Sequence, residues 1–166
     1  MTQGKFQPPL PINEPIRTYE PNTSETNSLK KTLEKINLEK TQIPLVINGK
    51  KIFDREPYSI HAPHNKNKII AEAQQAEKED IHEAIKCSVK VQKDWNALPW
   101  EERASVFLKA ADLLSTHYRD LMNASTMVGQ SKSCFQSEID AACELADFFR
   151  FNVKFAEKIY EDQPLY

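Results

Sequence analysis

The chain has 166 residues, of which 40% are hydrophobic and 28% charged, and its net charge is −2 at pH 7. This balance excludes a typical nucleic-acid-binding domain, which carries a strongly basic face. The three glycines, Gly4, Gly49 and Gly129, lie too far apart to form a phosphate-binding loop, so neither a Walker loop nor a complete Rossmann fingerprint can be built.

The first 40 residues predict an arm and then a surface helix. Residues 1–23 carry five prolines, which remove backbone donors and fix φ, so this segment is expected to be extended and ordered only against another part of the protein. Residues 24–40 predict a helix capped by Ser24 or Thr26. Its narrow apolar stripe consists of Leu29, Leu33 and Ile36.

Residues 43–76 predict strands. Asn48-Gly49 separates residues 45–47 (LVI) from residues 50–53 (KKIF), which is the signal of a hairpin with a type I′ turn. A second pair, 58–61 and 68–73, is separated by a turn over 63–67. Four short strands make at most a small antiparallel sheet that needs a cover on its apolar face.

Residues 80–160 predict helices. Asp80 and Glu83 form a capping-box pattern at the start of the first, and Pro99 suits the first turn of the second. A third helix begins near Arg119 and is expected to stop at Gly129, acting as its C′ residue.

The last helix is predicted to run without a break from Ser133 to Tyr160, and two apolar stripes cover much of its circumference. Such a helix must be covered on more than one side. The chain offers too few partner elements, so we expect part of the cover to come from sequence outside these 166 residues. The fold class expected is α+β, with an extended arm, a small hairpin sheet and a helical C-terminal half.

Histidine and cysteine give weak signals for chemistry. His61 and His64 have a two-ligand spacing, but no further ligand lies nearby, so no metal site is predicted. Cys87, Cys134 and Cys143 form no Cys-x-x-Cys pair and are expected to be reduced and structural, with Cys134 the only one near a helix start.

Three acidic residues of the last helix fall on one edge at spacings of four and three: Asp140, Glu144 and Asp147. Like charges at these spacings repel slightly, so helix stability does not explain them. A solvated face is the simpler interpretation. The alternative is an acidic edge facing a cavity that holds a cation or an ammonium group.

Several stretches resemble the aldehyde dehydrogenase family. Residues 103–114 (RASVFLKAADLL) are similar to a helix of that family, while 126–132 (TMVGQSK) and 137–152 (SEIDAACELADFFRFN) resemble its 1-pyrroline-5-carboxylate dehydrogenase branch. Residues 13–15 (NEP) and 59–65 (SIHAPHN) fit the same branch. Ser131 stands where many relatives have glycine.

The resemblance implies the N-terminal part of the α/β aldehyde dehydrogenase fold, with residues 24–166 belonging to the NAD-binding domain after the arm of residues 1–23. The branch oxidises L-glutamate γ-semialdehyde to glutamate by cysteine attack and hydride transfer to NAD. The family's catalytic and cofactor residues find no counterpart here, so this chain is expected to be an N-terminal fragment, inactive alone. Glu144 alone is carried over, as a candidate contact for the substrate's ammonium group.

The resemblance also implies partners, namely the remainder of the same enzyme chain, a homo-oligomer and a small-molecule substrate. No membrane span is expected, because no run approaches about 20 apolar residues. Residues 1–28 show neither a signal peptide nor an Arg-rich transit peptide, which predicts a cytoplasmic protein, with the mitochondrial matrix as the alternative in a eukaryote. The competing hypothesis is a non-catalytic helical interaction module.

Overall fold

The computed structural model describes residues 7–162, and they form an α+β arrangement as predicted. The helices are α1 (Ser24–Leu38), α2 (Lys78–Ala97), α3 (Trp100–Ser115), α4 (Arg119–Gln130), α5 (Cys134–Ser137), the π-helical segment η1 (Glu138–Cys143) and α6 (Glu144–Glu161). The strands are β1 (Thr41–Ile43), β2 (Leu45–Ile47), β3 (Lys50–Ile52), β4 (Pro57–Ala62) and β5 (Asn65–Gln74).

The hairpin β2–β3 is confirmed, and Asn48 and Gly49 both have positive φ, 50° and 74°, as a type I′ turn requires. The prediction of one antiparallel sheet is wrong. The hairpin is a separate two-stranded sheet, and the other sheet has the order β1–β5–β4. Strand β1 runs parallel to β5, with Thr41 opposite Ala71. All three β1 residues are exposed, so no apolar alternation revealed this strand.

The helix caps differ from the predicted ones. The N-cap of α1 is Thr23, whose hydroxyl accepts from the backbone N–H of Thr26. In α2 the capping box consists of Glu77 and Asp80, because the Asp80 carboxylate is already fixed by Arg55, with both Nε and Nη2 donating at 2.9 Å. The predicted box, with Asp80 as N-cap, began the helix one turn too late.

The end of α4 also differs. The helix continues through Gly129 to Gln130, and Ser131 takes the left-handed conformation at φ 56°. This is the position that glycine occupies most easily. Ser131 therefore holds the conformation that the sequence analysis assigned to Gly129.

The long C-terminal helix is interrupted near its start. Instead of one α-helix over 133–160, η1 separates α5 from α6, and the Glu144 N–H donates to the carbonyl of Ile139, five residues back. A π turn shifts the side chains that follow it relative to those before it. Glu138 lies at the beginning of this segment and is completely buried.

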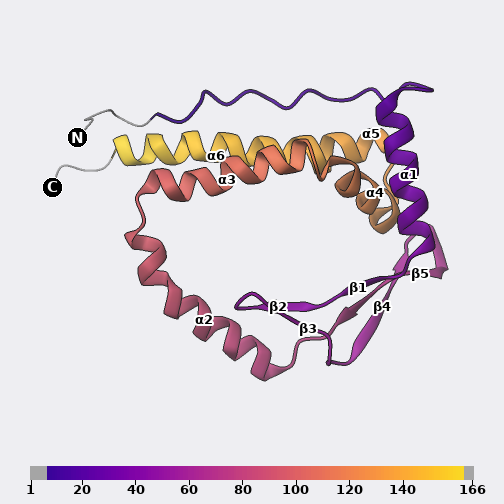
Figure 1. The fold of residues 1–166 in the computed structure, drawn as a ribbon, viewed down its shortest axis with the longest axis horizontal. Coiled ribbons are helices and arrows are strands. Elements are labelled where there is room, and N and C mark those ends of the chain that lie inside the picture. Colours follow the sequence, from indigo (N-terminus) through magenta and orange to yellow (C-terminus); the bar gives the residue numbers. More distant parts are fainter. Residues whose placement is uncertain (1–6, 163–166) are drawn as a thin grey trace.

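Figure 1 shows the arm running beside α6, with α3 packed along the same helix, and α2 leading away from α3 toward the strands. The core lies where α3, α4, η1 and α6 meet, and small residues such as Ala111, Ala124, Ala142 and Ala146 let these helices approach closely. No helix of residues 7–162 is long and apolar enough to cross a membrane.

Part of the α6 surface is left uncovered. Ala146 and Val153 of the first stripe are buried, but Phe148, Phe155 and Ile159 of the second are 54%, 57% and 63% exposed. The apolar residues Ile81, Ile85 and Val89 of α2 are exposed as well. Residues 7–132 thus leave the second stripe of α6 uncovered, as expected from the sequence.

Candidate functional site

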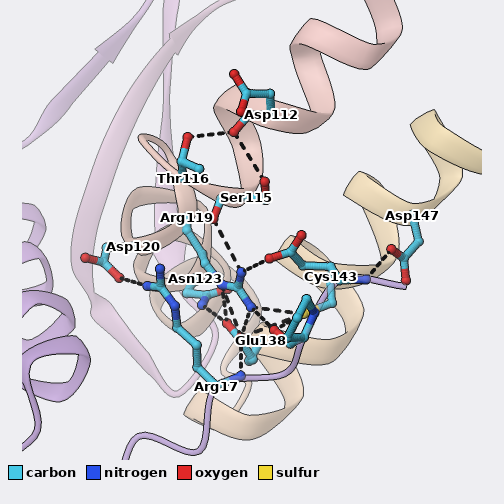
Figure 2. Close-up of polar contacts among 12 residues, drawn as sticks. Arg17, Asp112, Ser115, Thr116, Arg119, Asp120, Asn123, Glu138, Cys143 and Asp147 are labelled. Carbon is cyan, nitrogen blue, oxygen red and sulfur yellow. Dashed lines mark hydrogen bonds and ion pairs between the residues drawn. The ribbon is translucent and has the colours of Figure 1, made fainter. Parts of the chain in front are cut away.

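A buried ion pair between Arg119 and Glu138 lies behind the candidate site. Arg119 opens α4 and Glu138 opens η1, and their side chains are 3% and 0% exposed. The Nε of Arg119 donates to both carboxylate oxygens at 3.2 and 3.3 Å, and Nη2 pairs with Oε1. Asn123, one turn along α4, donates from Nδ2 to Oε2 at 2.7 Å. Figure 2 shows these groups converging from separate elements.

The same pair fastens the arm. The backbone N–H of Arg17 donates to Glu138 Oε1 at 2.8 Å, and the Tyr19 hydroxyl donates to Oε2 at 3.0 Å. From the other side, Arg119 Nη2 donates to the carbonyl of Pro15 at 2.6 Å, and Nη1 pairs with Glu14. Because proline has no N–H, carbonyls and side chains make most of the arm's contacts. We call residues 14, 17, 19, 119, 123 and 138 the clasp.

The electrostatics of the clasp favour its charged form. Burial raises the pKa of Glu138, but the hydrogen bonds from Arg119 and the Arg17 backbone outweigh it and lower that pKa to about 2. Burial and the neighbouring Glu138 charge raise the pKa of Tyr19 to about 12, so the phenol keeps its proton. Burial opposes the charge of Arg119 too, yet the carboxylates of Glu138 and Glu14 raise its pKa overall.

A second set of contacts holds the arm to α6. Asp147 accepts from Asn13 Nδ2 at 2.8 Å and from the Glu14 backbone N–H at 2.7 Å. Arg150, one turn further, pairs through Nη1 with Glu14 Oε2 at 2.8 Å and with Asp147 Oδ1 at 3.7 Å. Glu14 is therefore shared between two arginines.

Beside these contacts lies an open groove of about 770 Å³, which we call the acidic groove. Its walls come from the arm, η1 and α6, and it is lined by Asn13, Glu14, Ile16, Ile139, Asp140, Cys143, Glu144, Asp147, Phe148, Phe151, Asn152 and Phe155. The structure thus brings all three residues of the predicted acidic edge to one groove with aromatic walls.

The three carboxylates of this edge differ in their partners. Asp140 accepts from Lys132 Nζ at 2.9 Å, and Asp147 holds the arm. Glu144 is exposed, and within residues 7–162 its side chain has no hydrogen-bond or ion-pair partner. Glu144 is therefore the carboxylate best placed to meet a cation or an ammonium group entering the groove.

The cysteines do not have the surroundings of a nucleophile. Burial, with the charge of Glu138, raises the pKa of Cys143 to about 11 and also raises that of Cys134. A hydrogen bond to Glu83 raises the pKa of Cys87. A reactive cysteine needs a lowered pKa, and the pKa of each of these three is raised instead.

The two histidines with ligand-like spacing point to different partners. His61 Nδ1 lies 2.6 Å from the carbonyl of Lys66, and His64 Nδ1 lies 2.7 Å from the hydroxyl of Ser131. In the described part of the chain no group of three or more His, Cys, Asp or Glu residues could hold a metal ion.

The sequence analysis missed the clasp. Arg119 was noted only as a helix start, and Glu138 only as part of a resembling stretch. The available signal was weak: Glu138 lies between Phe135 and Ile139 of the apolar stripe, where a charge needs a partner. Nothing in the sequence indicated that the partner would be Arg119 together with Glu14 of the arm.

Comparison with known protein families gives a match to the aldehyde dehydrogenase family model over residues 52–165. The chain belongs to the aldehyde dehydrogenase family. It is 44% identical over 158 residues to the mitochondrial delta-1-pyrroline-5-carboxylate dehydrogenase of Dictyostelium discoideum, covering 94% of this chain and 28% of that protein. The Bos taurus enzyme of the same name is 40% identical over 153 residues, covering 92% of this chain and 27% of that protein.

A solved structure of a family member also matches this chain. The Mycobacterium tuberculosis delta-pyrroline-5-carboxylate dehydrogenase bound with NAD and cobalamin matches with a TM-score of 0.94 and 40% identity, covering 100% of this chain and 31% of that one. This chain thus spans less than a third of the length of these relatives. It matches the N-terminal part of the aldehyde dehydrogenase fold.

Proposed function

We propose that this chain forms the N-terminal part of an NAD-dependent dehydrogenase that oxidises L-glutamate γ-semialdehyde to L-glutamate. The observation that carries the proposal is the 44% identity to a delta-1-pyrroline-5-carboxylate dehydrogenase across 94% of the chain. That match includes the elements that form the acidic groove. The role of the chain is to wrap the cofactor-binding domain and to line the substrate entrance, and a homo-oligomer is the expected state of the whole enzyme.

In this proposal Glu144 orients the substrate. The semialdehyde carries an α-ammonium group, and a carboxylate a few ångströms away in a partly dry groove would fix its position. The exposed position of Glu144 between Phe148 and Asp140 supports this role. Glu144 makes and breaks no bond. It selects an aldehyde with a positive charge at the far end.

The described residues of this chain do not fit NAD. A dinucleotide needs a glycine-containing turn between a strand and a helix, whereas Gly49 is in the hairpin turn and Gly129 lies inside α4. When bound, NAD accepts the hydride of the aldehyde. It would be held by parts of the enzyme outside the described residues.

A segment exchange tests the proposal. The matching segment of the Dictyostelium enzyme is replaced by this chain, and NADH absorbance is followed with L-glutamate γ-semialdehyde. The same exchange with the Bos taurus segment controls for tolerance of the swap. We expect NADH formation from the chimera and none from the 166-residue chain alone. A folded chimera without turnover, beside an active Bos taurus control, contradicts the proposal.

The alternative, a non-catalytic helical interaction module, requires little exposed apolar surface. The exposed faces of α2 and α6 count against it. An apolar dye added during a thermal melt separates the two: strong dye binding before the transition supports the dehydrogenase segment. The named eukaryotic relatives are mitochondrial enzymes, so the matrix is the compartment to examine beside the cytoplasm.

A further inference from the structure

The arm separates two grooves. On one side is the acidic groove, and on the other is a groove of about 440 Å³ between the arm, α3 and α6, lined in part by Leu108, Asp112 and Arg150. Asn13 and Glu14 line both. This short stretch of the arm is therefore a shared wall, and its position sets the width of the acidic groove.

Arg150 holds this wall from the far side. It lines only the second groove, yet its Nη1 pairs with Glu14 Oε2 at 2.8 Å and with Asp147 Oδ1 at 3.7 Å. Its Nη2 donates to the Ser115 hydroxyl at 3.3 Å, which ties the guanidinium to the end of α3. Arg150 thus reaches the acidic groove only through the carboxylates of Glu14 and Asp147.

We infer that Arg150 is a positioning residue for substrate binding: by bridging Glu14 and Asp147 it keeps the arm as the wall that faces Glu144. The inference rests on the proposed function. Among the described residues Arg150 is the only cation paired with Asp147, whereas Glu14 also pairs with Arg119. Without Arg150, Asp147 loses its ion pair and Glu14 keeps only Arg119. The repulsion among Glu14, Asp147 and Glu144 is then less compensated, and it moves the wall.

The test uses the active chimera with Arg150→Ala, Arg150→Lys and Asn13→Ala. We expect Arg150→Ala to raise KM for the semialdehyde about tenfold, the effect of one charge-assisted contact, and to leave kcat within about twofold. Arg150→Lys keeps the charge, so its KM is expected to stay close to that of the unsubstituted chimera. Arg55→Ala is the control, because Arg55 pairs with Asp80 far from the arm and its loss destabilises without touching the groove.

A second substrate distinguishes a loss of substrate positioning from a general loss of enzyme function. Glutarate semialdehyde lacks the ammonium group, so its KM is expected to change less with Arg150→Ala than that of the natural substrate. Should Arg150→Ala fail to fold, Asn13→Ala decides, since it removes only one exposed hydrogen bond to Asp147; a KM increase of about threefold supports the inference.

Failure of this inference can be distinguished from failure of the proposed function. An unsubstituted chimera without turnover removes the proposed function itself. An active chimera in which neither Arg150→Ala nor Asn13→Ala changes KM, or in which both substrates change equally, overturns the positioning role of Arg150 and leaves the proposed function intact.

Discussion

Arg119 and Glu138, 19 residues apart in the sequence, form a completely enclosed ion pair whose remaining hydrogen-bonding capacity is taken up largely by the arm. Pairs of this kind seldom add net stability over apolar residues of the same size, but losing one partner leaves an uncompensated buried charge. The pair therefore specifies where the arm docks.

Arg119→Ala is expected to reduce the free energy of unfolding by about 3–5 kcal/mol, because it strands the Glu138 carboxylate. Urea denaturation of the 166-residue chain measures the change. Lys132→Ala, which breaks the partly exposed pair with Asp140, is the matched control, and its cost should stay below about 1 kcal/mol. Equal costs for the two variants would contradict the role of the clasp.

Acid should weaken the fold through Glu138. Its pKa in the folded chain is about 2, below the ordinary 4.5, so the stabilisation is fully present above pH 4.5 and is lost as the pH falls toward 2. The lowered pKa of Asp80, fixed by Arg55, adds to the loss at low pH. When melting temperatures are measured from pH 7 to pH 2, we expect them to decrease between pH 4.5 and pH 2. Glu138→Gln should flatten the dependence, and an unchanged slope in that variant would count against the assignment.

Two glycine substitutions should act in opposite directions. Gly129 lies within α4, and an added Cβ would meet only Ile70 Cδ1 at 4.0 Å, so Gly129→Ala is expected to stabilise by about 0.5–1 kcal/mol. Gly49 has φ +74° in the hairpin turn, so Gly49→Ala is expected to destabilise by about 1 kcal/mol. Thermal melts of both variants test this. Destabilisation by Gly129→Ala would instead support the sequence-based prediction that Gly129 is the C′ residue of α4.

Ser131→Gly places the preferred residue at the left-handed position that ends α4. The relief of backbone strain, about 1 kcal/mol, is offset in part by loss of the exposed hydrogen bond to His64. A small rise in melting temperature is expected. Ser131→Ala serves as the comparison, because it loses the same hydrogen bond and keeps the strain, and should therefore lower the melting temperature.

Glu144→Gln in the chimera should raise KM for the semialdehyde about tenfold with little change in kcat, because a charge-assisted contact to the ammonium group becomes a neutral one. Asp140→Asn is the matched control: this carboxylate lines the same groove but already pairs with Lys132. A larger effect from Asp140 than from Glu144 would transfer the proposed contact to Asp140.

The sequence predicted those features that depend on local pattern. Helical periodicity located all the long helices, and Asn48-Gly49 located the hairpin. The caps at Thr23 and Glu77 were missed because several polar residues near each helix start can serve, and tertiary contacts such as Arg55 with Asp80 decide among them. Strand β1 was missed because its pairing with β5 supplies its only reason to be extended.

The candidate site, too, was predicted only where it depends on local sequence pattern. The acidic edge follows from spacing on one helix, and the groove contains all three of its residues. The arm contacts of Asp147 and the pairing of Glu138 with Arg119 depend on segments brought together only by the fold. A charged residue is usually solvent-facing, so the position of Glu138 between Phe135 and Ile139 was too weak a signal to distinguish it from the exposed acids around it.

The docking of the arm has a consequence for synthesis on the ribosome. Glu14 meets Arg119 only 105 positions later, and its backbone N–H meets Asp147 133 positions later. The arm, which precedes these partners in the chain, therefore cannot complete its docking until residues 119–147 have been translated. Arg119 precedes Glu138 by 19 positions, so Glu14 meets its first partner before the contacts with Glu138 and Asp147 can form.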